Sequence, residues 1–135
     1  MDVAYIALGS NLGDRAAHLD MARAAIAALD RTAVLAISSV EETAPLGPIP
    51  QDPYLNQMIA VTTELSPREL LERLHGIERS AGRERRERWG PRTLDLDIVL
   101  FERQAVDEPG LTVPHPELAN RDFWQREILE LRGAS

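Results

Sequence analysis

Short apolar runs recur along the chain, and they predict four β-strands. Residues 3–8 read VAYIAL, an unbroken apolar run that is typical of a buried strand. Residues 33–41, 54–64 and 93–101 also have strand character. No apolar stretch approaches the roughly 20 residues that a membrane-spanning helix needs. The pattern therefore favours a water-soluble protein built around a sheet, with no membrane partner.

Two helical patterns lie between these strands. The first helix is expected to follow Asn11, which would cap it with Asp14 three positions later. The second has a complete start signal, with Ser66 as cap, Pro67 at the first position and Glu69 closing a capping box. Their predicted buried faces are Leu19, Ala22, Ile26 and Leu29 in the first helix, and Leu70, Leu74 and Ile77 in the second.

The predicted order is strand, helix, strand, strand, helix, strand, which is the split βαβ arrangement of ferredoxin-like α+β folds. It implies an antiparallel sheet with two helices packed on one face and the other face covered by loops or open for a ligand. A length of 135 residues fits one domain, 1–135. The tail, residues 122–135, has Trp124, Ile128 and Leu131 at helical spacing.

Two segments resist regular structure. ETAPLGPIPQDPY contains four prolines and predicts a long, partly stiff loop. GSNLGD suggests a phosphate-binding loop, but a Walker motif ends in Gly-Lys-Ser/Thr and the chain has no lysine. It is interpreted as a strand-to-helix turn instead.

Composition excludes several classes of protein. The chain has no cysteine, so disulfide frameworks, thiolate zinc sites and a cysteine nucleophile are ruled out. A net charge of −7 argues against a general nucleic-acid binder. The first ten residues lack the basic region of a signal peptide, so a cytoplasmic protein is expected.

The positive charge is unevenly distributed. All 15 basic residues are arginines, and guanidinium groups suit phosphate. Glu84 and Glu87 interleave with a cluster of them, so a local anion site and a solvated charged loop both remain open. The cluster consists of Arg79, Arg83, Arg85, Arg86, Arg88 and Arg92.

Two aspartates lie inside the last strand pattern. Side chains alternate along a strand, so Asp95 and Asp97 share one face while Leu94, Leu96 and Ile98 point toward the helices. Adjacent carboxylates repel each other, and Mg²⁺ with bound phosphates would relieve that repulsion. An exposed strand face paired with arginines is the alternative explanation.

Residues near the two aspartates in the sequence also favour a role in phosphoryl transfer. Arg92 precedes Asp95 by three residues, and carboxylate-bound metal beside arginine suits a transition state with charge on phosphate oxygens. His115 lies between two prolines and is either a fixed hydrogen-bond donor or a structural turn residue. His18 and His75, on predicted helices, are interpreted as peripheral.

A flat ligand is also suggested. Tyr54 and Asn56 share a strand face beside the proline-rich loop. An aromatic ring could stack a heterocycle while an amide reads its polar edge. The alternative is that the aromatic residues belong to the core.

Several motifs together resemble one enzyme family. AYIALGSNLGD, TAPLGP, YLN, IERSAGRERRERWGPRTLDLDI, LTVPHP and NRDF are similar, in order and spacing, to the 6-hydroxymethyl-7,8-dihydropterin pyrophosphokinase family of folate biosynthesis, over residues 3–123. The resemblance implies transfer of pyrophosphate from ATP to the pterin hydroxymethyl group, with release of AMP. It also implies two Mg²⁺ ions, the ferredoxin-like fold and flexible loops at 10–14, 44–53 and 82–92; we expect a monomer.

The resemblance assigns roles by position. Asp95 and Asp97 would bind metal, and Arg83, Arg92 and Asp97 would be catalytic. ATP would contact Glu78, Arg85, Ile98, His115 and Arg121. The pterin would contact Thr43, Leu46, Gly47, Tyr54, Asn56, Trp89 and Phe123, with Tyr54 and Phe123 sandwiching the ring.

The sequence departs from the family after Phe123, where it reads WQREILELRGAS. This tail is expected to close the fold as a helix rather than as an edge strand. It motivates an alternative function, a catalytically weak pterin- or nucleotide-binding module. A nucleotide-sugar transferase using the Asp-x-Asp pair is a third hypothesis, for which the chain is short and the surrounding motif does not match.

Overall fold

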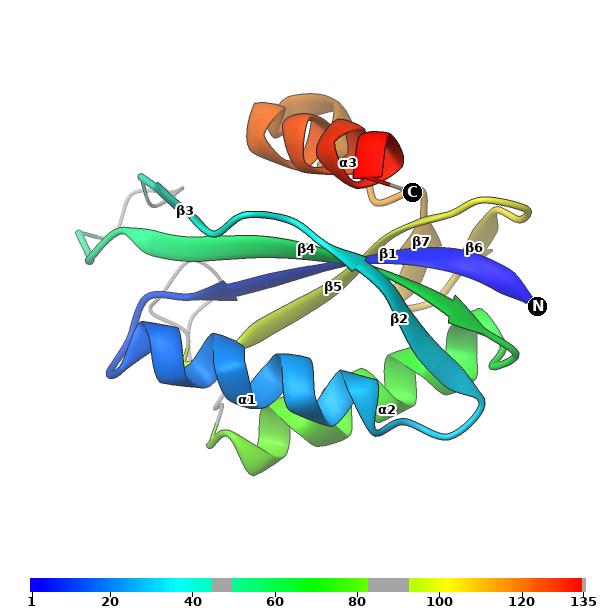
Figure 1. Cartoon of the computed structure of the whole chain (residues 1–135), viewed down its shortest axis with the longest axis horizontal. Helices are drawn as coiled ribbons and strands as arrows, with labels where there is room; N and C mark the ends of the chain where they lie inside the picture. The colour runs from blue at the N-terminus through cyan, green and yellow to red at the C-terminus, as the bar shows by residue number, and fades with distance from the viewer. Residues whose placement is uncertain (45–49, 83–92, 135) are drawn as a thin grey trace.

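A computed structural model describes residues 1–44, 50–82 and 93–134. The described chain forms the main sheet and three α-helices (Figure 1). The elements are β1 (Asp2–Ser10), α1 (Arg15–Ala27), β2 (Thr32–Ile37), β3 (Glu41–Thr43), β4 (Tyr54–Thr63), α2 (Pro67–Ser80), β5 (Asp95–Phe101), β6 (Val106–Glu108), β7 (Leu111–Val113), a 3₁₀ turn (Leu118–Asn120) and α3 (Asp122–Ala134).

The main sheet has the order β2-β4-β1-β5, and every pair is antiparallel. β3 pairs with the beginning of β4 beyond the end of β2. The helices α1 and α2 lie on one face of the sheet (Figure 1). This strand order and layering confirm the predicted α+β, ferredoxin-like fold.

Strand alternation divides the apolar residues between the two faces of the sheet. The face toward α1 and α2 carries the larger core, and the opposite face packs against α3. Leu94, Leu96 and Ile98 lie in the larger core, as the alternation predicted. The smaller core consists of Tyr5, Ala7, Met58, Ala60, Val99, Trp124, Ile128 and Leu131.

Helix α3 is the main difference from the expected layers. The second face was expected to be open or covered by loops, but α3 covers part of it (Figure 1). Trp124, Ile128 and Leu131 are 3%, 5% and 2% exposed, so the helical spacing of the tail is a buried stripe. The ends of β1 and β4 nearest to β3 extend past α3 (Figure 1).

The cap of α1 is a correction. Asp14, not Asn11, is the N-cap, and its side chain accepts a hydrogen bond from the Ala17 N–H. The Asn11 amide instead donates to Gln51 Oε1 at 2.6 Å and to the Asp52 carbonyl at 3.0 Å. The Asn11 side chain, which the local pattern assigned to the helix cap, therefore bonds to residues distant in the sequence instead.

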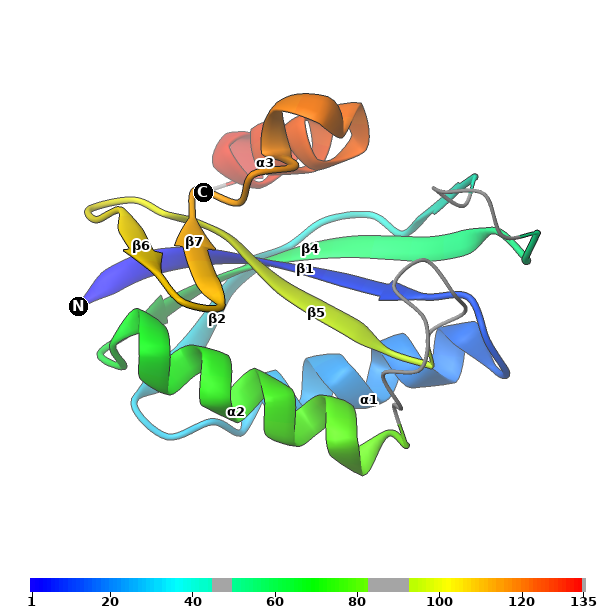
Figure 2. The same cartoon turned by 180° about the vertical axis from the view of Figure 1, so that it is seen from behind.

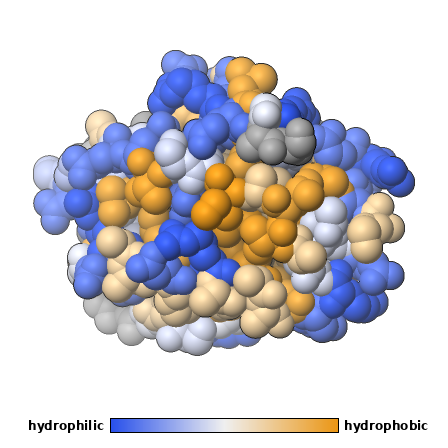
Figure 3. All heavy atoms as spheres, in the orientation of Figure 1, coloured by the Kyte–Doolittle hydropathy of each residue, from blue (hydrophilic) through white to orange (hydrophobic). Residues whose placement is uncertain are grey.

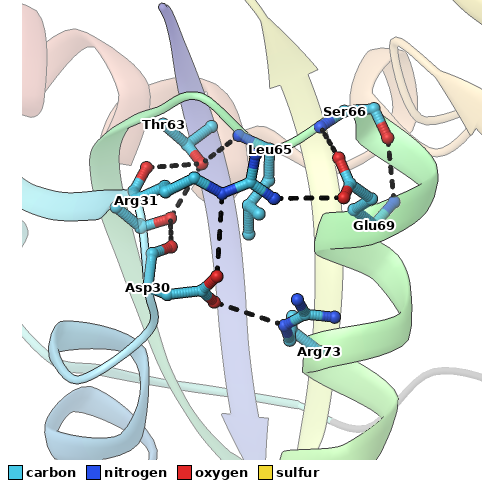
Figure 4. Close-up of polar contacts among 8 residues, drawn as sticks. Asp30, Arg31, Thr63, Leu65, Ser66, Glu69 and Arg73 are labelled. Carbon is cyan, nitrogen blue, oxygen red and sulfur yellow. Dashed lines mark hydrogen bonds and ion pairs between the residues drawn. The ribbon is translucent and has the colours of Figure 1, made fainter.

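The start of α2 forms as predicted and is linked to the turn before β2 (Figure 4). Ser66 and Glu69 make the complete capping box. Arg31 has a φ of 54°, and its side chain donates to Glu69 Oε2 at 3.1 Å. Arg73 donates to Asp30 on the same turn. These contacts fix the α1–β2 turn against the first turns of α2.

β2 is an edge strand that contributes little to the core. Apolar side chains gather on this face of the molecule (Figure 3). Val34, Leu35, Ile37 and Val40 are 39%, 50%, 51% and 47% exposed. The strand is held mainly by its ladder to β4, which shifts register between Val34 and Ala36.

Strands β6 and β7 form a small hairpin beside β5 that the sequence did not predict (Figure 2). Gly110 lies in its turn with a φ of +76°, a conformation that favours glycine. None of the helices in the described ranges is long and apolar enough to cross a membrane.

Candidate active site

One row of the sheet joins the two ends of the predicted site. Gly9 on β1 pairs with Asn56 on β4 and with Asp95 on β5. Directly opposed residues in an antiparallel sheet point to the same face, so Asn56 and Asp95 flank a residue without a side chain. A Cβ built on Gly9 would lie 3.4 Å from Tyr54 Cδ1 and 3.5 Å from Asn56 Oδ1. The row thus has no side chain between an amide and a carboxylate, and Tyr54 Cδ1 and Asn56 Oδ1 border this position.

Asp97 lies on the next row, opposite Ala7, and shares the face of Asp95. Its side chain is 30% exposed. Beyond it, β5 contains one extra residue relative to β1, because Tyr5 pairs with Leu100 while Ile6 pairs with Ile98. The Val99 carbonyl accepts the His115 N–H at 2.8 Å. The irregularity therefore brings His115 onto β5 beside the aspartates.

His115 presents a defined hydrogen-bond donor. Its Nδ1 accepts the Glu117 N–H at 3.0 Å, so the neutral ring carries its proton on Nε2. Nε2 lies 3.7 Å from Asp97 Oδ1. Burial, followed by the charge of Arg121, lowers the pKa of His115. Near neutral pH the ring is a neutral Nε2–H donor facing the aspartates.

Arg121 precedes α3 and caps it, because its carbonyl accepts the N–H groups of Trp124 and Gln125. Its guanidinium carbon lies 4.3 Å from the centroid of the Trp124 ring. Arg121 Nε is buried, with no hydrogen-bond partner in the described part of the chain. His115 meets the same indole edge-on, with ring centroids 4.9 Å apart. Both predicted phosphate ligands therefore contact Trp124.

A cleft of about 330 Å³ runs along the free edge of β5. Because β5 is the last strand of the main sheet, residues from both of its faces reach this cleft. Ile98 belongs to the helix-side core and still lines the cleft for this reason. The lining residues are Leu71, His75, Asp95, Leu96, Asp97, Ile98, Gly110, Leu111, Thr112, His115 and Pro116.

His75 is a residue that the sequence interpretation missed. It was interpreted as peripheral, yet it faces the cleft with Asp95 and His115. It lies one helical turn after Leu71, on the flank of α2 rather than on the stripe of Leu70 and Leu74. Only the position of β5 beside α2 makes that flank part of the site.

Glu78 lies beneath the cleft rather than in its lining. It is 3% exposed, and its Oε2 accepts the Leu96 N–H at 2.8 Å. Leu96 separates Asp95 from Asp97, so the carboxylate fixes the backbone that carries both aspartates. Its expected contact with ATP stays a prediction.

Three predicted pterin residues, Thr43, Tyr54 and Asn56, lie together at the β4 end of the row. Thr43 and Tyr54 pair across β3 and β4, and the Asn56 amide donates to Thr43 Oγ1 at 2.5 Å. Phe123, in the first turn of α3, contacts Trp124 at a ring distance of 6.2 Å. The sandwich of Tyr54 and Phe123 around a ligand remains a prediction.

The base of the proline-rich segment is tied to the turn after β1. Besides the Asn11 contacts, Arg15 donates to the Pro53 carbonyl at 2.8 Å and pairs with Glu42 at 3.1 Å. These contacts fix the entry to β4 next to Tyr54. Six predicted site residues, Leu46, Gly47, Arg83, Arg85, Trp89 and Arg92, lie outside the described residues.

The two aspartates suit Mg²⁺ as a substrate-bridging ion. The described residues contain no group of three or more acidic or histidine side chains arranged to hold a metal alone. Two neighbouring carboxylates on a cleft are nevertheless the usual protein contribution to a magnesium site that also takes phosphates and water. Asp95 and Asp97 provide that set.

Comparison with known proteins identifies the family of the chain. The model of the 7,8-dihydro-6-hydroxymethylpterin-pyrophosphokinase family matches residues 5–133. The chain belongs to this family. The match extends through α3, so the unusual tail lies within the family's domain.

Curated relatives support the assignment. The chain is 44% identical over 130 residues to the 2-amino-4-hydroxy-6-hydroxymethyldihydropteridine pyrophosphokinase of Bacillus subtilis, covering 96% of this chain and 78% of the relative. It is 46% identical over 123 residues to the enzyme of that name in Haemophilus influenzae, covering 91% and 77%. The corresponding Pseudomonas aeruginosa enzyme is 44% identical over 119 residues, covering 88% and 74%.

Proposed function

We propose that the row of Asn56, Gly9 and Asp95 is where this chain performs the reaction of its family. The chain is an ATP-dependent pyrophosphokinase of folate biosynthesis. The hydroxymethyl oxygen of 6-hydroxymethyl-7,8-dihydropterin forms a bond to the β-phosphorus of ATP, the bond from that phosphorus to the α-phosphate oxygen breaks, and AMP leaves. The pairing of Asn56 and Asp95 with one glycine is the observation that supports this placement.

Asp95 and Asp97 would hold Mg²⁺ in this proposal, and the family resemblance implies two ions. Bound there, magnesium supplies charge neutralisation and alignment of the phosphates. The residues contribute rigidity, because Leu96 between them is anchored by Glu78. Asp97 is then a metal ligand, and a metal-bound carboxylate is a weak base for the hydroxyl proton.

His115 and Arg121 are the phosphate donors of the described site. The proton on His115 Nε2 and the guanidinium of Arg121 offer directed hydrogen bonds to phosphate oxygens. A neutral His115 avoids adding a second cation beside Arg121. Arg83, Arg85 and Arg92 are expected to add further contacts from their segment.

Asn56 reads the polar edge of the pterin, and Tyr54 and Phe123 enclose its ring. Asn56 is only 7% exposed, so its other hydrogen-bonding groups would meet the ligand largely shielded from water. The hydroxymethyl group would pass from the Asn56 side toward the Asp95 side above Gly9, beside the Tyr54 ring. Thr43 orients the Asn56 amide through their hydrogen bond.

The test is AMP formation from ATP and Mg²⁺, with and without 6-hydroxymethyl-7,8-dihydropterin. Pterin-dependent AMP is the expected result. Pterin binding with no AMP would favour a binding module, which the unusual tail had suggested. The burial of Trp124, Ile128 and Leu131 supports the enzyme, because the tail completes the core on that face.

A further inference from the structure

Trp124 lies between two side chains that the proposed function uses. The residue is 3% exposed and belongs to the core beneath α3. Its indole meets the His115 ring edge-on at 4.9 Å, with an angle of 86° between the planes. The Arg121 guanidinium carbon lies 4.3 Å from the indole centroid. One buried ring thus contacts both phosphate donors.

Polar contacts fix the side chain of His115 more fully than that of Arg121. His115 is anchored through its N–H to the Val99 carbonyl, and through Nδ1 to the Glu117 N–H. Arg121 Nε, by contrast, is buried without a hydrogen-bond partner among the described residues. The aromatic face beneath the guanidinium is therefore the contact that sets its position.

We propose that Trp124 is a positioning residue for the nucleotide: its ring fixes the spacing of the His115 Nε2–H and the Arg121 guanidinium so that both reach the phosphates of ATP. The inference rests on the proposed function of the site. It adds a requirement for an aromatic side chain at residue 124, beyond the apolar bulk that core packing needs.

Substitutions at residue 124 can separate the need for an aromatic ring from the need for apolar bulk. A phenyl ring keeps a face for the guanidinium and an edge for the imidazole. A leucine fills part of the same space but offers neither. Leu131 is a matched control because it belongs to the same core, is 2% exposed and lies seven residues beyond Trp124 on α3.

The experiment measures the Kd of a non-hydrolysable ATP analogue with Mg²⁺, together with KM values and unfolding free energies, for wild type, Trp124→Phe, Trp124→Leu and Leu131→Ala. Losing a cation–π contact and an aromatic pair is expected to weaken ATP binding about tenfold in Trp124→Leu. Trp124→Phe should remain near wild type. Leu131→Ala should lower the unfolding free energy while keeping the Kd of the ATP analogue.

A spectroscopic readout follows the contact without using activity. The Nε–H signal of Arg121, assigned by its loss in Arg121→Lys, should be shifted by the aromatic ring at residue 124 and protected from exchange in wild type and Trp124→Phe. It should join the exposed arginine signals in Trp124→Leu.

Equal losses of ATP affinity in Trp124→Leu and Leu131→Ala would overturn the inference, since they would show a purely structural effect. An unchanged Kd and Nε–H signal in Trp124→Leu would overturn it as well. If wild type itself does not bind the analogue, the proposed function fails and the inference fails with it. That outcome is distinguishable because it appears before any substitution.

Discussion

Asn56 and Asp95 pair with the same residue, Gly9, from opposite sides of β1. The amide proposed to read the pterin and the carboxylate proposed to hold metal are therefore two strands apart on one face. The reacting hydroxymethyl group has to cross from one to the other. Gly9 adds no side chain to that crossing, which Tyr54 Cδ1 and Asn56 Oδ1 border.

Enlarging residue 9 should block this crossing. Gly9→Ala places a Cβ 3.4 Å from Tyr54 Cδ1, an ordinary contact, so the fold should persist with a modest rise in pterin KM. Gly9→Leu should raise the pterin KM by about 100-fold, because the added side chain would occupy space that the substrate needs. Steady-state kinetics at saturating ATP measures both. Gly76→Ala, on α2, is the control and should leave KM unchanged; an unchanged KM in Gly9→Leu would contradict the proposed path.

Replacing Asp97 should lower activity without lowering the stability of the fold. Asp97→Ala is expected to lower turnover by about 1,000-fold, since metal stabilisation of phosphoryl charge is worth several kcal/mol. The unfolding free energy should stay the same or rise, because Asp95 loses a neighbouring like charge. Chemical denaturation and AMP release measure the two effects. Asp107→Ala, on the exposed side of β6, should change neither; substantial activity in Asp97→Ala would exclude Asp97 as a ligand.

Local patterns predicted the parts of the fold that local physics determines. The faces of Leu94, Asp95 and Leu96 follow from strand alternation, and the Ser66 capping box follows from its own sequence. The N-cap of α1 was misassigned because Asn11 satisfies its amide with residues forty positions away, Gln51 and Asp52. A local pattern carries no information on such partners.

The remaining site features depend on strand pairing. Gly9 becomes part of the site only because β1 lies between β4 and β5 in the sheet. His75 lines the cleft only because β5 lies at the sheet edge beside α2. The β6–β7 hairpin was missed because three-residue strands show too little periodicity to be recognised. Trp124 was predicted as a helical core residue, but its contacts with His115 and Arg121 required the folded chain.

Glu127 should make stability fall as pH rises. It is 2% exposed on α3, and neither of its oxygens has a hydrogen-bond partner among the described residues. Burial raises its pKa to about 8, assisted by Glu41 and Glu130 and opposed by Arg126. The unfolded chain ionises at a lower pH than the folded one. The contribution of Glu127 to the unfolding free energy is therefore fully present at acidic pH, and it is lost progressively as the pH rises to about 8.

The measurement is unfolding free energy against pH for wild type and Glu127→Gln. Wild type should lose on the order of 4 kcal/mol from this group between acidic pH and pH 9. Glu127→Gln should remove most of that slope and be more stable than wild type at pH 8. Glu72→Gln, exposed on α2, is the control and should keep the wild-type slope. Parallel curves for wild type and Glu127→Gln would show that Glu127 does not carry the effect.

Glu78 should matter as an acceptor rather than as a charge. Glu78→Ala leaves the Leu96 N–H buried without this partner and should cost about 1–3 kcal/mol of stability. It should also weaken Mg²⁺-dependent activity, because Leu96 connects Asp95 to Asp97. Glu78→Gln retains an oxygen acceptor and should recover most of both. Denaturation and Mg²⁺ titration of activity measure the effects; equal losses in the two variants would point to the charge itself.

A crystal structure of the chain with a non-hydrolysable ATP analogue, Mg²⁺ and 6-hydroxymethyl-7,8-dihydropterin tests the central claim most directly. We expect the pterin edge on Asn56, the metal on Asp95 and Asp97, and the hydroxymethyl group over Gly9, pointing to the β-phosphate. A pterin bound away from Asn56, or magnesium bound away from both aspartates, would contradict the account.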